Sequence, residues 1–94
     1  MNNKEKLFIN IKQVLEEGSK YSGISVSDNA IKKALNGNLD MCKVLLSIIG
    51  ERIKWWLKCD INKALYAKEI YDMLEDFYMM VENDWQHEKI RRNL

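Results

Sequence analysis

The sequence predicts an all-α fold, a compact bundle of about four helices that ends in a long amphipathic C-terminal helix. Three observations support this prediction. The 94-residue chain contains no proline, so no residue of that type interrupts a helix. Apolar residues recur at intervals of three and four along most of the chain. Only residues 21–27 have a strand-like composition, and they are too few to build a sheet. A chain of this length forms a single all-α domain, residues 1–94.

Two helices are expected in the first part of the chain. The first covers residues 4–17 and should stop near Gly18. Its apolar side carries Leu7, Phe8, Ile11, Val14 and Leu15. After a loop, Ser27 is a good N-cap for a short helix over residues 28–35. The sequence "NGN" at residues 36–38 then ends that helix.

The third helix, residues 39–58, is apolar around more than half of its circumference, so it should lie centrally in the bundle. Adjacent helical residues point about 100° apart. Of the adjacent tryptophans, Trp56 falls near the middle of the apolar arc and is expected in the core. Trp55 falls at the margin, where a rim or interface position is expected. The last helix, residues 61–91, spans about 46 Å and has one apolar and one acidic half.

The junction between the last two helices has two possible positions. Asp60 can cap a new helix and so form an antiparallel hairpin, whereas a break at Gly50 would give one long helix. The hairpin is favoured. It leaves the last helix longer than its neighbour, so the end that bears Val81, Trp85 and Ile90 extends beyond it. That end would be covered by the first two helices, by a second copy of the chain or by a foreign partner.

Composition excludes several classes of protein. The net charge of +1 gives no overall field that would attract nucleic acid or an anionic membrane. No apolar run approaches 18 residues, so no membrane association through a spanning helix is expected, and the first residues do not resemble a signal peptide. Cys42 and Cys59 would lie about 25 Å apart on one helix, beyond disulfide reach. Two buried, inert thiols and a cytoplasmic location are therefore expected.

Catalytic and metal-binding patterns are missing from the sequence. The single histidine, His87, has Asp84 three residues before it, but such a pair supplies only two metal ligands. A solvated surface histidine is expected, with no metal and no other cofactor. The glycines are scattered singly rather than gathered in a phosphate-binding loop. The carboxylates of the last helix lie on an exposed face, where burial would not raise their pKa values. The protein is therefore expected not to be an enzyme.

Aromatic residues repeat every seven positions along the last helix, at Tyr71, Tyr78 and Trp85, and such spacing is typical of a helix-packing seam. The seam can be intramolecular or can face a partner, because tyrosine, tryptophan and methionine are enriched at binding surfaces. We expect a non-enzymatic adaptor or inhibitor of the kind encoded by phages or mobile elements, which binds a protein partner and forms a homodimer. The predicted partner-binding residues are Trp55, Tyr71, Tyr78, Val81, Trp85 and Ile90.

DNA binding is the alternative. Gly23, Ile24 and Ser25 would form a turn, followed by an eight-residue helix and the apolar helix after "LNG". On these residues, the segment 23–49 resembles the second half of a phage-repressor-type helix-turn-helix. The resemblance implies that residues 28–35 form a recognition helix in the major groove. The residues facing the groove would be Asn29, Lys32 and Lys33.

Overall fold

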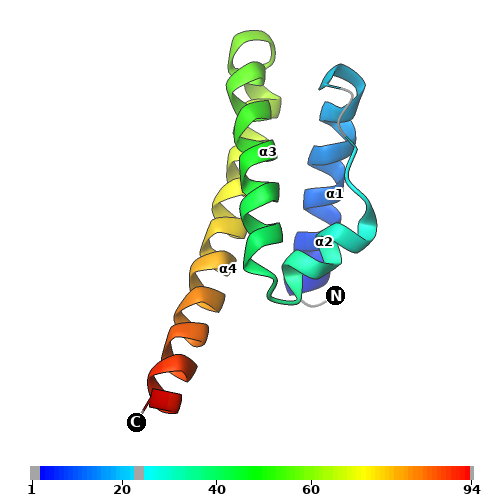
Figure 1. Ribbon diagram of the computed structural model, residues 1–94. Coiled ribbons are helices and arrows are strands. Elements are labelled where there is room, and N and C mark those ends of the chain that lie inside the picture. Colours follow the sequence, from blue (N-terminus) through cyan, green and yellow to red (C-terminus); the bar gives the residue numbers. More distant parts are fainter. Residues whose placement is uncertain (1–2, 23–24, 94) are drawn as a thin grey trace.

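Among the residues that the structure describes, four helices follow one another in the order predicted from the sequence, and no strand occurs (Figure 1). The structure, a computed structural model, describes the backbone of residues 3–22 and 25–93 and the side chains of residues 3–17 and 25–84. The helices are α1 (Asn3–Ser22), α2 (Asp28–Leu35), α3 (Leu39–Cys59) and α4 (Ile61–Asn93). The all-α bundle with a long C-terminal helix is confirmed.

Side chains fix the beginnings of three helices. The hydroxyl of Ser27 accepts a hydrogen bond from the amide of Ala30, 3.2 Å away, at the start of α2. Asn38 Oδ1 accepts one from the amide of Met41 at the start of α3. Asp60 Oδ1 accepts one from the amide of Lys63 at the start of α4. Each contact supplies an acceptor to an amide of the first turn, which lacks the usual carbonyl partner four residues earlier. The amide of Ala30 also donates to the backbone carbonyl of Ser27, 3.1 Å away.

The hairpin at Asp60 is confirmed. The amide of Asp60 donates to the carbonyl of Trp56 at 2.7 Å, which closes the last turn of α3. Gly50 stays inside α3. A Cβ atom built there would lie 3.7 Å from Cε2 of Tyr71 on α4. The glycine therefore sits in the contact between two antiparallel helices rather than at a break.

The predicted end of the first helix was wrong. The sequence placed it near Gly18, but α1 continues to Ser22. A glycine within a helix costs about 1 kcal/mol relative to alanine, which is too little to end a helix by itself. The strand-like stretch at residues 21–27 forms no strand where it is described.

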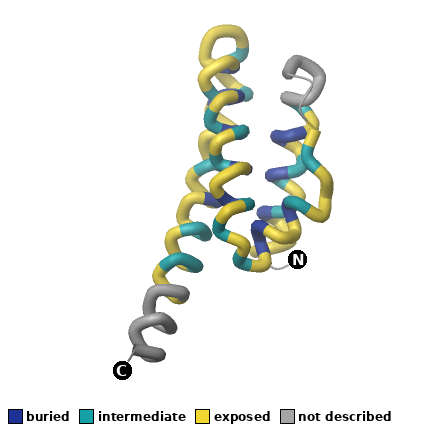
Figure 2. The backbone as a smooth tube through the Cα atoms, in the orientation of Figure 1, coloured by how far each residue is buried: buried dark blue, intermediate teal, exposed yellow. Residues whose placement is uncertain are grey.

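All four helices contribute to one core, and the buried positions lie where the helices face one another (Figure 2). Trp56 is 2% exposed and Trp55 is 43% exposed, which confirms the predicted division between core and margin. The largest fully buried side chains are those of Ile11, Val14, Ile31, Cys42, Leu45, Ile49 and Leu74.

A buried cation connects α1 to α3. Arg52 is the only charged residue buried among the described side chains, and its Nη1 donates a hydrogen bond of 2.7 Å to the carbonyl oxygen of Leu15. Removal from water lowers the pKa of the guanidinium from its ordinary value. The group is still a cation at neutral pH, because an arginine side chain does not lose its proton in proteins.

The apolar half predicted for α4 is wider than the face that the bundle covers. Ala64, Ala67, Ile70 and Leu74 are buried. The series Tyr66, Met73 and Met80, which helical spacing places on the apolar half, is exposed. The other helices cover only one stripe of α4, so this series lies at the edge of the contact with α1.

Candidate protein-binding grooves

A groove with an apolar floor runs between α1 and α4, and we call it the α1–α4 groove. Its volume is about 610 Å³. Leu7 of α1 is buried beneath it, and Phe77 of α4 is half-buried. Met73 and Met80 are 44% and 55% exposed, and their spacing of seven residues places them on one side of α4. The lining is completed by Asn3, Lys4 and Asp76.

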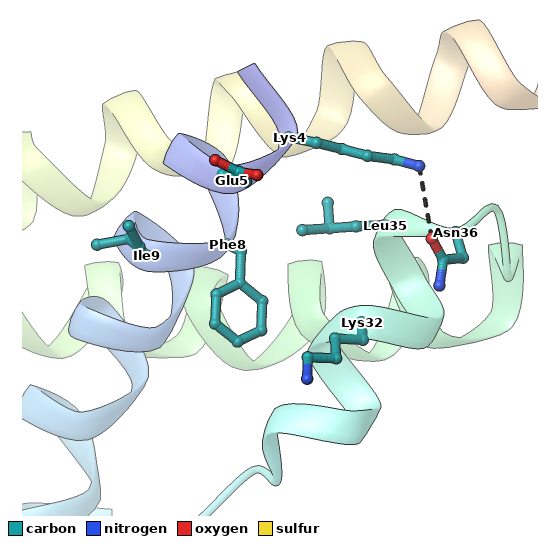
Figure 3. A pocket seen from close by; sticks show the side chains of 7 residues that line it. All are labelled: Lys4, Glu5, Phe8, Ile9, Lys32, Leu35 and Asn36. Atoms are coloured by element: carbon teal, nitrogen blue, oxygen red, sulfur yellow. Dashed lines mark hydrogen bonds between the residues drawn. The ribbon is translucent and has the colours of Figure 1, made fainter. Parts of the chain in front are cut away.

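A second groove lies on the other side of α1, between α1 and α2, and we call it the α1–α2 groove. Its volume is about 410 Å³. Figure 3 shows the ring of Phe8 directed into the space between the helices, with Leu35 approaching from α2. Lys4 reaches across to Asn36, with 3.5 Å between Nζ and Oδ1. The remaining lining residues are Glu5, Ile9 and Lys32.

The two grooves arise because the first turns of α1 lie between α2 and α4. Leu7 and Phe8 are adjacent, so their side chains point about 100° apart. Leu7 lines the α1–α4 groove, and Phe8 lines the α1–α2 groove. Lys4, which precedes them by one turn, lines both grooves.

A third cavity, of about 380 Å³, lies near the α3–α4 turn, and polar contacts join the helices beside it. Lys63 Nζ lies 3.1 Å from a carboxylate oxygen of Glu17. The hydroxyl of Tyr66 lies 3.2 Å from Gln13 Oε1. Trp56 also lines the cavity, and its buried Nε1 has no hydrogen-bond partner among the described residues.

Three of the predicted partner-binding residues take part in the packing of the chain itself. Tyr71 and Tyr78 are half-buried against the core. A Cβ atom on Gly50 would lie 3.7 Å from the Tyr71 ring, and Lys68 Nζ lies 5.8 Å from the centre of that ring. Val81 approaches the turn before α3, where a Cβ atom on Gly37 would lie 3.7 Å from its Cγ1.

The structure does not bring Trp55 together with these residues. Trp55 follows Gly50 by five positions on α3, which places it about 140° around the helix from the side that meets Tyr71. Trp85 and Ile90 belong to α4, but their side chains lie outside the described residues. Of the four predicted residues whose side chains are described, Trp55 therefore lies apart from the other three.

The three predicted DNA-contacting residues, Asn29, Lys32 and Lys33, are all exposed on α2. Their spacing places them on one side of that helix. Lys32 also lines the α1–α2 groove, and Lys33 does not.

The two cysteines differ in environment, and both are free. The prediction of two buried thiols was wrong for Cys59, which is exposed near the end of α3. Cys42 is buried, its thiol donates to the carbonyl of Ala34 at 3.2 Å, and burial raises the pKa of this thiol. Within the described residues, no group of three or more His, Cys, Asp or Glu side chains could hold a metal ion.

The two grooves were not predicted from the sequence. Leu7 and Phe8 were expected on one apolar side of the first helix, but helical spacing does not show that Leu7 lies beside Met73 and Met80 of α4. Ile9 was a usable signal, because it lies off that apolar side and is still apolar. It is exposed in the structure and lines the α1–α2 groove.

Comparison of the chain with protein-family models, with curated proteins and with solved structures gives no match. Its function must therefore be inferred from its own residues and geometry. Over the part of the chain that the structure describes, no helix has the length and apolar character needed to cross a membrane.

Proposed function

We propose that this protein is a non-enzymatic protein-binding domain whose α1–α4 groove takes apolar side chains from a helix of a partner. The observation that carries the proposal is the pair of exposed methionines, Met73 and Met80, above a floor of Leu7 and Phe77. A helix that docks in an apolar groove inserts side chains spaced by three, four and seven residues. Methionine suits such a groove, since its flexible, polarisable side chain adapts to irregular partners.

An adaptor or inhibitor of the type used by phages and mobile elements fits this proposal, because such a role requires a binding surface and no catalytic group. We include self-association in the proposal. α4 has 33 residues and α3 has 21, and the backbone of α4 continues past the start of α3 (Figure 1). Two free cysteines, one of them exposed, suit the reducing conditions of the cytoplasm.

The test compares two neighbouring methionines of equal exposure. Met80 lines the groove, whereas Met79 does not, and each is 55% exposed. Tagged wild-type chain, Met80→Glu and Met79→Glu would be used to capture proteins from an extract of the natural host. We expect one protein to be retained by the wild type and by Met79→Glu, and retained at least about tenfold less by Met80→Glu.

Circular dichroism would establish that both variants keep the helical fold. Equal retention by the two variants would contradict the proposal, because a charge inside an apolar groove should oppose docking. Trp85→Ala in the same experiment tests the residues that the sequence predicted.

DNA binding is a second candidate, favoured by the exposure of Asn29, Lys32 and Lys33 on one side of α2. A gel shift with random duplex DNA at low salt tests it. This function requires a shift that disappears when both Lys32→Glu and Lys33→Glu are introduced, since each lysine would contribute phosphate contacts.

A further inference from the structure

The α1–α2 groove combines an apolar floor with cations supplied by two different helices. Phe8 and Ile9 belong to α1, and Ile9 is exposed although it is fully aliphatic. Leu35 of α2 is buried and forms the opposite wall. Lys4 and Lys32 supply the two ammonium groups, so apolar contact and attraction of an anion are available at one site.

Positively charged side chains outnumber negatively charged ones around this groove. Asp28 is the only acidic residue of α2, and its carboxylate lies 3.2 Å from Lys12 Nζ of α1. Lys32 and Lys33 occupy the last turn of α2. Lys32 forms no ion pair with any residue that the structure describes. Glu5 is the one carboxylate among the residues that line the groove.

We propose that the α1–α2 groove binds an acidic amphipathic helix of a partner protein. This proposal rests on the protein-binding function proposed above and names the chemistry of the partner. The apolar side of the partner helix lies on Phe8, Ile9 and Leu35. Carboxylates along its edges meet Lys4 on one side and Lys32 on the other, which selects acidic over basic helices.

Charge complementarity favours this occupant over duplex DNA. DNA would meet the exposed lysines of α2 through phosphates and would leave the apolar floor uncovered. The two kinds of ligand also differ in which lysines they need. A helix in the groove needs Lys32 and not Lys33, because only Lys32 lines the groove, whereas DNA would use both.

The experiment uses three synthetic helical peptides with the same leucines at positions i, i+3, i+4 and i+7. Their flanking polar positions are all glutamate, all glutamine or all lysine. Fluorescence anisotropy of the labelled peptides measures binding to the full chain at low and at high salt. Chemical shifts of methyl groups show where the peptide lies, with Ile9 and Leu35 reporting on the α1–α2 groove and Met73 and Met80 on the α1–α4 groove.

We expect the glutamate peptide to bind most tightly, to weaken with added salt and to shift the methyl signals of Ile9 and Leu35. Lys4→Glu and Lys32→Glu should each weaken its binding by about tenfold. Lys33→Glu is the matched control, an exposed lysine on the same helix outside the groove, and should change binding by less than about twofold.

Three results would overturn the inference. One is equal binding of the glutamate and glutamine peptides. Another is a loss with Lys33→Glu as large as with Lys32→Glu, which would indicate general attraction of anions such as DNA. The third is binding that shifts only Met73 and Met80. That last result would support binding in the α1–α4 groove, as in the proposed function, and would refute binding of an acidic helix in the α1–α2 groove. The experiment therefore distinguishes failure of one proposal from failure of the other.

Discussion

Arg52 shows how much a single residue contributes to holding α1 in place. Its buried guanidinium donates to the carbonyl of Leu15, and hydrogen bonds from charged groups contribute about 1.5–3 kcal/mol. We expect Arg52→Met, which keeps most of the apolar stem, to lower the free energy of unfolding by that amount. Lys54→Met is the control, because Lys54 is exposed and pairs only with Glu51 in the described structure. It should change stability by less than about 0.5 kcal/mol, as measured by urea denaturation.

The two cysteines are expected to differ in reactivity. The thiolate is the reactive form, and burial raises the pKa of Cys42 above its ordinary value of about 9.0. Iodoacetamide should modify exposed Cys59 at mildly alkaline pH while leaving Cys42 intact, and peptide mass spectrometry measures each site. Comparable labelling of the two residues in the folded protein would contradict this prediction.

The same shift gives a direction for the pH dependence of stability. The neutral thiol of Cys42 is favoured in the folded state, so its contribution is complete below the ordinary thiol pKa. That contribution is lost as the pH rises above it, because the unfolded chain ionises first.

At the scale of the helices, replacing either of two glycines by alanine should change stability, in opposite directions for the two positions. Gly37 has φ +104° in the turn before α3, a conformation that costs residues with a Cβ about 1–2 kcal/mol. Gly50 lies inside α3, and an added Cβ would be in ordinary contact with Tyr71 at 3.7 Å. We expect Gly37→Ala to destabilise the protein by about 1–2 kcal/mol and Gly50→Ala to stabilise it by about 0.5–1 kcal/mol. Thermal unfolding followed by circular dichroism would measure both, and changes of the same sign would contradict this account of the two glycines.

Much of the fold could be predicted from local signals. Ser27 and Asp60 are caps whose side chains bond to the amides three residues after them, so a short sequence window contains all that they require. The end of α1 could not be predicted this way, because a glycine permits a helix to end and does not force it to. The grooves could not be predicted either, because they depend on which helices pack against α1 in the folded protein. Helical periodicity places the adjacent apolar residues Leu7 and Phe8 on the buried side of α1. It does not show that Leu7 faces α4 whereas Phe8 faces α2.

At the scale of the whole molecule, the protein is elongated, with principal extents of 52 × 26 × 23 Å. Every buried residue of the described part of α4 lies at or before Leu74. We therefore expect a chain that stops after Asp84 to keep its fold, with a free energy of unfolding within about 1 kcal/mol of the full chain. A larger loss would show that residues 85–94 cover the core.

Sedimentation of the same two chains tests self-association. If a dimer forms through the extended end of α4, the full chain sediments as a dimer and the shortened chain as a monomer. A full-length chain that stays monomeric at high concentration would remove the homodimer from the proposed function.

Lys4 has a consequence for a partner that reaches both grooves. The single ammonium of Lys4 lines both the α1–α4 groove and the α1–α2 groove, and it cannot contact ligands in both grooves at the same time. A ligand that draws this side chain toward α2 deprives the opposite groove of its cation, and linkage requires the reverse to hold equally. If both grooves bind anionic ligands, occupancy on one flank of α1 would therefore lower the affinity on the other, and the two ligands would compete without touching.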